Sequence, residues 1–371
     1  MRFPIALARL ASTAGLLALL LPACRTSRPL TQRPLPTTAA IASEGLLTCF
    51  APGTAIDGKA VWCEASAVWA DGKQVLVAND KDMPAGQSSV FSVPLTALAD
   101  TSQRPSYLPA SPFRSGTKYE DFAQTPDGRF TLLCTAFDRV KPSSTDWDAY
   151  NTILCWPTGQ PDQARVLAPT AGSPTSVAYR EPLARVLATD EYPGTLPYFK
   201  IEGLAATRTH LLFGVREAGK AYDNFKHVDK VVAVSYTVEG NQLRVGDHWR
   251  VVADFKPETA DASLPAPLGL SSLEYDPARD CVWLLTSYEK GGQVDAYLWV
   301  NRLTDLLADK PFQLIRDAQG QALRFGHKAE DLTMLPDNRL LVIHDDDRVQ
   351  TRVGTATRQP NQAAYTILTL K

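Results

Sequence analysis

The 371-residue sequence lacks the short motifs that mark several common enzyme classes. It has no His-Glu-x-x-His pair, no phosphate-binding loop and no dinucleotide fingerprint, and Gly269-Leu-Ser271 lacks the closing glycine of a nucleophile elbow. None of its six cysteines forms a Cys-x-x-Cys pair, so a zinc or thioredoxin-like site has no support. It also lacks a basic excess, with 38 Lys and Arg against 40 Asp and Glu, which argues against nucleic-acid binding.

Long apolar runs are scarce as well, and the one at the N-terminus predicts export. Two arginines precede the run at residues 10–21, which is too short to span a membrane comfortably. The run ends in Leu-Pro-Ala-Cys24, which resembles the site at which bacterial lipoproteins are cleaved and lipidated. We therefore predict a signal peptide at 1–23, and a lipidated Cys24 with a Pro-rich flexible tether at 24–45. The protein would then be anchored at the periplasmic face of the outer membrane or at the cell surface. The alternative is an ordinary secretory signal.

The remaining cysteines suit an oxidising compartment. Cys49 and Cys63 bracket a short segment with Pro and Gly that can close as a loop. Cys134 and Cys155 lie in two strand-like runs that can pair as a hairpin. We predict both disulfides, each contributing about 2–4 kcal/mol. Cys281 lies in an apolar run and is predicted to be a buried free thiol.

A recurring phrase organises residues 46–371. In each copy a short strand meets a tight turn, often Asp-Gly, and a second apolar strand follows. The copies begin at Glu64, Glu120, Glu202, Ser271 and Glu330, at spacings of roughly 55–80 residues. Near-regular units of this size, each forming a small antiparallel sheet, are typical of a β-propeller.

We predict an all-β fold made of a single propeller with six blades, with five blades as the alternative. The sixth blade depends on a weaker copy at Thr175–Tyr179, which leads into Ala184–Thr189. Because the chain ends in a strand at Tyr365–Leu370, residues 46–50 can complete the last blade and close the ring. Two stacked β-sandwiches are the other architecture, although they would not require a common phrase.

Charged side chains gather at one end of the predicted hairpins. If the first strand of each copy lines the axis, its start and the end of the antiparallel second strand lie at the same mouth of the channel. Lys118, Lys200 and Lys328 each precede a Glu by two residues, so each shares the face of that Glu. The second strands end in further polar residues, which include Asp80, Asp138, Arg216, Glu217, Glu289, His344, Asp345 and Asp346.

Two interpretations of this mouth remain open. In the first, alternating charges form ion pairs with one another and stabilise the contacts between neighbouring blades. Alternatively the mouth is a functional site, in which carboxylates bind a hard cation such as calcium and basic groups hold an anionic substrate. The catalytic candidates are then Glu120, Glu202, Glu330 and Arg216, the substrate-binding candidates Lys118, Lys200, Lys328, Glu289 and His344, and the metal ligands Asp80, Asp345 and Asp346.

Two of the copies resemble a known group. Lys200-Ile-Glu-Gly-Leu-Ala followed by Leu-Leu-Phe-Gly-Val-Arg216, and Lys328-Ala-Glu-Asp-Leu followed by Leu340-Leu-Val-Ile-His-Asp-Asp, are similar to phrases of the phytase-like propeller families, described as "esterase-like activity of phytase". The resemblance covers most of residues 60–350. It implies an exported propeller that cleaves phosphoesters or esters, and it carries over only to the Glu and Arg positions named above.

Two functional hypotheses from different classes follow. The first is a lipid-anchored, metal-assisted phosphoester or ester hydrolase, with Glu120, Glu202 and Glu330 near the metal and Arg216 on the phosphate. The second is a non-catalytic ligand-binding or scaffolding propeller of the cell envelope. The expected partners are the membrane, through the lipid anchor, and a small anionic ligand or an envelope protein. We expect a monomer that binds no nucleic acid.

Overall fold

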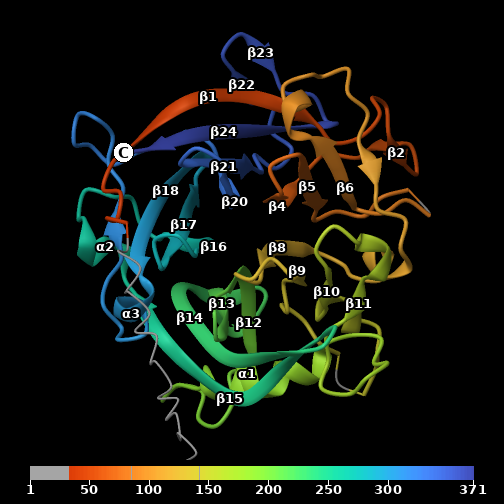
Figure 1. Ribbon diagram of the computed structural model, residues 1–371, viewed down its shortest axis with the longest axis vertical. Helices are drawn as coiled ribbons and strands as arrows, with labels where there is room; N and C mark the ends of the chain where they lie inside the picture. The colour runs from red at the N-terminus through yellow and green to blue at the C-terminus, as the bar shows by residue number, and fades with distance from the viewer. Residues whose placement is uncertain (1–32, 85, 142) are drawn as a thin grey trace, which may run out of the picture. The chain divides into compact units, whose positions relative to one another are not determined.

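The computed structural model describes residues 33–84, 86–141 and 143–371, and these residues form five four-stranded antiparallel sheets around a central axis (Figure 1). Blade 1 consists of β4 (Ala65–Ala70), β5 (Gln74–Asn79), β6 (Val90–Pro94) and β7 (Ser106–Tyr107). Blade 2 consists of β8 (Tyr119–Gln124), β9 (Phe130–Thr135), β10 (Ile153–Pro157) and β11 (Arg165–Val166). Blade 3 consists of β12 (Tyr198–Ala206), β13 (His210–Ala221), β14 (Asn224–Glu239) and β15 (Gln242–Phe255).

The last two blades complete the ring. Blade 4 consists of β16 (Gly269–Asp276), β17 (Cys281–Lys290), β18 (Gln293–Arg302) and β19 (Gln313–Leu314), and blade 5 of β20 (Ala329–Leu335), β21 (Arg339–His344), β24 (Gln362–Leu370) and β1 (Ala39–Thr48). Two small hairpins, β2–β3 (Ala55–Ile56 and Lys59–Ala60) and β22–β23 (Arg352–Val353 and Ala356–Thr357), lie outside the blades. The α-helices are α1 (Arg180–Val186), α2 (Pro257–Ala260) and α3 (Leu303–Leu306). None of the helices in the described ranges is long and apolar enough to cross a membrane.

The recurring phrase forms the two inner strands of each blade. Its turns have the conformations that a tight hairpin requires: Asp337 and Asn338 both have positive φ, which suits a type I′ turn between β20 and β21. Apolar side chains of neighbouring blades then pack together in five clusters, each shared by two adjacent blades. The core is therefore divided among the blade interfaces, and the axis is left to other residues.

Closure of the ring by the two chain ends is confirmed. The outermost strand β1 pairs with β24 in an antiparallel register that runs from Ala39 opposite Leu370 to Thr48 opposite Gln362. The strand begins earlier than the sequence suggested, because residues 39–45, assigned to the flexible tether, already pair with β24. The predicted signal peptide and the lipidation site at Cys24 lie outside the described residues.

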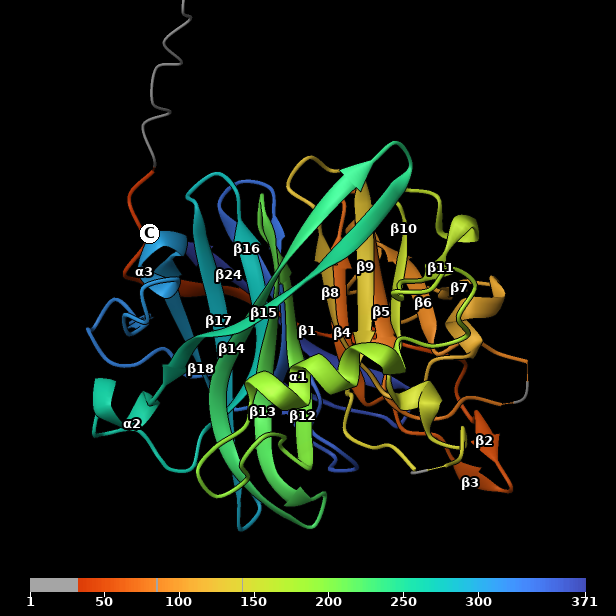
Figure 2. The same cartoon turned by 90° about the horizontal axis from the view of Figure 1, so that it is seen from below.

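The preferred number of six blades is wrong, and the alternative of five is correct. The segment taken as a weak sixth copy is helical: a 3-10 turn at Val177–Tyr179 runs into α1, which contacts β15 on the outside of blade 3 (Figure 2). Tyr179, Leu183 and Leu187 are buried in the cluster between blades 2 and 3. A spacing of four residues between apolar side chains is typical of a helix, so this pattern in the sequence favoured a helix over a strand.

One of the two predicted disulfides forms. Cys49 and Cys63 are bonded, whereas Cys134 and Cys155 are free and buried. In the β9–β10 hairpin Cys134 lies opposite Ile153, and Cys155 lies opposite Leu132. The two thiols are thus offset by two residues across the ladder, which is too far for a disulfide. Cys281 is a buried free thiol, as predicted.

Candidate functional site

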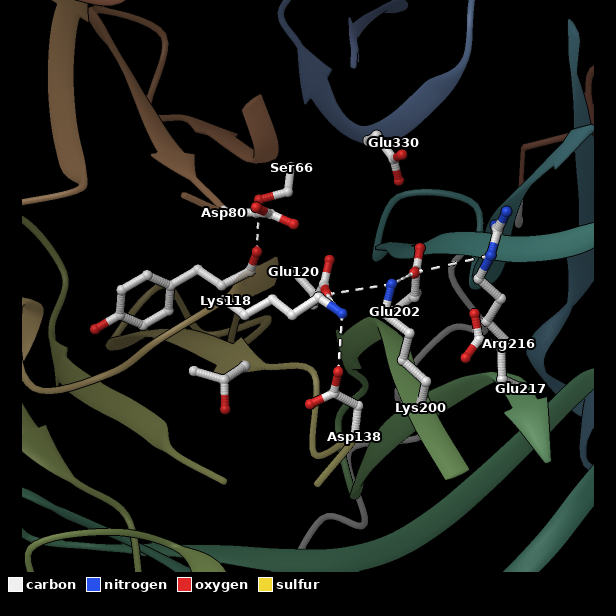
Figure 3. Close-up of polar contacts among 12 residues, drawn as sticks. Ser66, Asp80, Lys118, Glu120, Asp138, Lys200, Glu202, Arg216, Glu217 and Glu330 are labelled. Carbon is white, nitrogen blue, oxygen red and sulfur yellow. Dashed lines mark hydrogen bonds and ion pairs between the residues drawn. The ribbon is translucent and has the colours of Figure 1, made fainter. Parts of the chain in front are cut away.

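Every inner strand carries a β-bulge at the same height of the channel. On each of β4, β8, β12, β16 and β20, one residue has no partner in the ladder, although the residues directly before and after it are paired. The five bulge residues are Ser66, Glu120, Glu202, Ser271 and Glu330. A bulge changes the direction of its side chain, and Figure 3 shows four of these residues, Ser66, Glu120, Glu202 and Glu330, around one mouth near the axis. The fifth, Ser271, is linked to this group through Arg216, whose Nη1 lies 3.0 Å from Ser271 Oγ. We call the five bulge residues the bulge ring.

The bulge ring corrects the alignment of the first copy. Glu64, which marked the start of that copy, is two residues ahead of the ring position, and Ser66 takes the place of a glutamate in blade 1. Aligning the copies on the apolar residue two places after the bulge, Val68 in blade 1 and Phe122 in blade 2, gives the correct register.

The three lysines predicted to share the face of a Glu do contact the bulge ring. Lys200 lies between two glutamates: its Nζ is 3.4 Å from Glu120 Oε1 and makes a close hydrogen bond to Glu202. Lys118 Nζ is 2.9 Å from Asp138 Oδ2 and 3.9 Å from Glu120 Oε1 (Figure 3). On the opposite side, Lys328 Nζ lies 2.9 Å from Glu330 Oε1. The contacts agree with the two-residue spacing, although Lys118 and Lys328 precede their strands and each Glu is a bulge residue, so regular strand alternation is not their cause. The functional roles of the lysines stay a prediction.

The three buried glutamates have different pKa values. Burial raises the pKa of the Glu120 carboxyl well above its usual range, and the Lys200 charge offsets this only in part. Burial also raises the pKa of Glu330, against the opposing charge of Lys328. Burial would raise the pKa of Glu202 too, but Lys200 and Arg216 together outweigh it and lower that pKa to about 2. The ionised carboxylate of Glu202 thus lies near two carboxyl groups whose pKa values are raised, that of Glu120 more strongly.

Arg216 has partners within the protein. Its Nη1 donates hydrogen bonds to a group of three oxygens: the carbonyl oxygen of Gly269 at 3.1 Å, Ser271 Oγ at 3.0 Å and Ser287 Oγ at 2.9 Å. Its Nε lies 3.8 Å from Glu202 Oε1. Because these contacts join β13 of blade 3 to β16 and β17 of blade 4, Arg216 positions Glu202 and links the two blades.

A second layer of carboxyl groups, missed by sequence reasoning, lies directly below the bulge ring. Asp121 and Asp331 follow the bulge residues of β8 and β20, are almost fully buried and lie close enough for each to influence the pKa of the other. Together they accept hydrogen bonds from groups of four inner strands, β4, β12, β16 and β20, whereas the fifth, β8, carries Asp121 itself. Asp121 Oδ2 accepts from the amides of Leu204 (2.7 Å) and Leu273 (3.2 Å), and Asp331 accepts from the amides of Val68 and Leu332 and the hydroxyl of Ser272 (each 2.6 Å). Burial raises the pKa of Asp331 to about 8 and that of Asp121 well above its usual range. The Glu-Asp pairs in blades 2 and 5 were the available signal.

The predicted metal ligands do not come together as expected. Asp345 approaches Glu64 and Asp347, and the three carboxylates offer ligand atoms within 4.8 Å of one another. Asp346 points elsewhere, because its Oδ2 lies 2.7 Å from His327 Nδ1. Asp80 pairs with Lys81, at 2.8 Å.

Two residues predicted to bind substrate have different surroundings. Glu289 is partly exposed, with its Oε2 3.7 Å from Lys328 Nζ at the mouth. His344 is fully buried, its Nε2 lies 2.9 Å from Thr366 Oγ1, and burial lowers its pKa to about 3. The side chain of His344 is thus not exposed at the mouth, and its role in substrate binding stays a prediction.

No protein-family model and no curated protein matches the chain. Among solved structures, the catalytic domain of the GH62 α-L-arabinofuranosidase of Coprinopsis cinerea is 12% identical, with a TM-score of 0.43, and the match covers 91% of this chain and 98% of that one. The PQQ-bound aldose sugar dehydrogenase of Streptomyces coelicolor is 14% identical, with a TM-score of 0.35, covering 88% and 100%. A putative glycoside hydrolase of Parabacteroides distasonis is 11% identical, with a TM-score of 0.40, covering 94% and 95%. At these scores the neighbours carry no information on activity, so the phytase-like resemblance stays a prediction.

Proposed function

We propose that the protein is a hydrolase whose reaction takes place at the bulge ring, with a phosphoester or ester of a small anionic molecule as substrate. The observation that carries this proposal is that three buried glutamates lie at one mouth with different charged neighbours, which separate their pKa values. Environments that separate the pKa values of neighbouring carboxyl groups are how enzymes assign acid and base roles. The reaction would be general acid–base hydrolysis.

The roles follow from the direction of each pKa shift. Glu120, with the more strongly raised pKa, holds a proton and donates it to the leaving-group oxygen. Glu330 in its ionised form takes a proton from the water that attacks phosphorus or the carbonyl carbon, and the ester bond to the leaving oxygen breaks. Glu202 is too weak a base at neutral pH to take a proton, so its fixed charge holds Lys200 and Arg216 in place. Lys118 and Lys328 face the mouth and would bind the anionic group of the substrate.

A cation fits one edge of this mouth. The residues that would hold it are Glu64, Asp345 and Asp347, an all-oxygen set of the kind that calcium prefers. Asp345 supports this assignment, since burial and the neighbouring Glu330 raise its pKa although Lys328 opposes them. When bound, calcium would supply positive charge that stabilises an anionic substrate.

Export and lipid anchoring are part of the proposal. The Cys49–Cys63 disulfide supports an oxidising compartment. Expression of the full chain with a radiolabelled fatty acid would label the wild type but not Cys24→Ser, and it would locate the protein in the membrane fraction. Equal labelling of both would contradict anchoring through Cys24.

A second candidate function is a binding or scaffolding propeller without catalysis. The observation that favours it is the mutual pairing of the charged groups, because Lys118, Lys200 and Lys328 each have carboxylate partners without any ligand.

Hydrolysis assays separate the two candidates. The purified domain is tested on p-nitrophenyl phosphate, p-nitrophenyl acetate and phytate, with calcium or with a chelator. For the hydrolase, Glu120→Gln and Glu330→Gln should each lower kcat about 10²–10⁴-fold, whereas Glu239→Gln, an exposed side chain on blade 3, should leave it unchanged. Absence of turnover on all three substrates, with ligand binding that survives Glu202→Gln, would favour the binding propeller.

A further inference from the structure

A cavity of about 450 Å³ lies beside the mouth, outside the bulge ring. Residues 227–229 of β14 form one wall, Lys256 and Glu258 near α2 form a second, and residues 266–268, which lead into β16, form the third. It therefore lies between blades 3 and 4, next to the strands joined by Arg216. None of the residues assigned to acid–base chemistry lines it.

Two polar side chains of this cavity have unmet hydrogen-bonding capacity. Asp229 is only 3% exposed, and its Oδ1 has no hydrogen-bond partner in the described part of the chain. The buried Nδ1 of His227 is likewise without a partner there. Both residues lie on β14, at a bulge in its pairing with β13, and both line this cavity. A buried polar atom without a partner is costly, so two at one cavity indicate a missing partner.

The charged groups around the cavity indicate which kind of ligand it can bind. Burial raises the pKa of Asp229 well above its usual range, because Arg216 is its main counter-charge and compensates only in part. Burial and the nearby Arg216 lower the pKa of His227 to about 4, so the imidazole is neutral and can accept a hydrogen bond. Lys256 Nζ is already paired with Asp254 at 2.7 Å, whereas the exposed Glu258 has no ion pair among the described residues. The two atoms without partners, Asp229 Oδ1 and His227 Nδ1, can both accept hydrogen bonds, and Glu258 adds negative charge beside them. The unmet capacity is thus for a cationic hydrogen-bond donor, whose binding would favour the ionised form of Asp229.

We propose that this cavity binds a small primary alkylammonium ion. The ammonium group donates hydrogen bonds to Asp229 and His227, which gives the buried carboxylate its missing counter-charge. Val228, Pro267 and Leu268 provide apolar surface for the alkyl chain. A metal ion is a poorer match, because the described residues bring three ligand atoms within coordinating distance only at Glu64, Asp345 and Asp347.

Isothermal titration calorimetry on the full propeller tests this directly with pentylammonium, pentanol and pentanoate, which share the same chain. Pentylammonium should bind at least about 10-fold more tightly than either other compound, because only it brings a positively charged hydrogen-bond donor to Asp229. Asp229→Asn should weaken pentylammonium binding about 10-fold or more. Equal affinity for pentanol, or unchanged binding to Asp229→Asn, would overturn the proposal.

A second variant covers the case in which Asp229→Asn fails to fold. Glu258→Arg changes an exposed residue at the cavity and adds a competing cation, so it should weaken pentylammonium binding by about 3-fold or more without affecting folding. The matched control is Glu191→Gln, an exposed side chain outside the cavity, which should bind like the wild type. Unchanged binding to Glu258→Arg would contradict the proposed charge preference. Since binding is measured directly, the outcome is independent of whether the protein hydrolyses any substrate.

Discussion

At the scale of single residues, the charge of Glu202 organises the site. It is nearly fully buried, yet Lys200 and Arg216 keep it ionised, and they in turn depend on its charge. A buried ion pair contributes little net stability when intact, but removing one partner leaves an uncompensated buried charge. Each of these three charges therefore depends on the others, and even a conservative substitution of one of them should lower the free energy of unfolding.

Glu202→Gln removes that charge and keeps the size of the side chain. We expect the free energy of unfolding to fall by about 3–5 kcal/mol, because Lys200 and Arg216 lose their shared counter-charge. Urea unfolding followed by tryptophan fluorescence measures the change, and Glu239→Gln, on the exposed rim of blade 3, serves as the control. A loss for Glu202→Gln no larger than that of the control would show that the charge is not needed.

At the scale of elements, hydrophobic pattern and turn chemistry were enough to predict the inner hairpins but not their detailed register. The Asp-Gly and Asp-Asn turns were sufficient to locate blades 1, 2 and 5, because such a turn depends only on its own few residues. The bulges are set by packing around the axis, so Glu64 was aligned two residues away from Ser66. The Cys134–Cys155 pairing failed for the same reason, since a hairpin can be predicted without its register.

The Asp121–Asp331 pair makes the stability of the inner strands depend on pH. The pKa of Asp331 is about 8 in the folded protein, above the ordinary value of about 3.9 in the unfolded chain, so the folded state holds a proton that the unfolded chain releases. The contribution of this group to stability is fully present below pH 4 and is lost as pH rises towards 8. The slope approaches about 1.4 kcal/mol per pH unit for a full proton difference.

Urea unfolding between pH 5 and pH 8 measures this slope in the wild type and in Asp331→Asn. The amide cannot ionise, so the variant should show a shallower decrease in unfolding free energy with rising pH, whatever its absolute stability. Other groups that titrate in this range contribute equally to both proteins, so the difference between the slopes isolates the pair. Parallel pH profiles would contradict the raised pKa of Asp331.

At the scale of the whole molecule, the ring is held by its inner carboxyl pair and by the closing strand. The two inner carboxyl groups come from blades 2 and 5 and accept hydrogen bonds from blades 1, 3 and 4. The strand β1 pairs with the last strand, β24. The number of blades depends on this global closure. A sequence copy such as Thr175–Tyr179 can imitate a strand locally, whereas the ring closes with five sheets and leaves that segment as a helix outside blade 3.

Truncation distinguishes a closing strand from a tether. A chain that starts at Leu46 lacks residues 39–45, which pair with β24. It should lose at least about 2 kcal/mol of unfolding free energy, because several ladder hydrogen bonds are removed, and it should aggregate more readily through the exposed edge of β24. The control is a chain that starts at Arg33. Equal stability and solubility of the two chains would indicate that residues 39–45 belong to the flexible tether and do not stabilise the ring.

The central claim is that the three ring glutamates occupy different protonation states, and carboxyl NMR tests it without any substrate. With ¹³C-labelled glutamate, and with Glu120→Gln, Glu202→Gln and Glu330→Gln used to assign the signals, the chemical shifts of the side-chain carboxyl groups are followed from pH 2 to pH 9. We predict that Glu202 titrates near pH 2, whereas Glu120 and Glu330 titrate above their ordinary value of about 4.3, with Glu120 the higher. Titration of all three near their ordinary value would contradict the acid–base assignment on which the proposed hydrolysis rests.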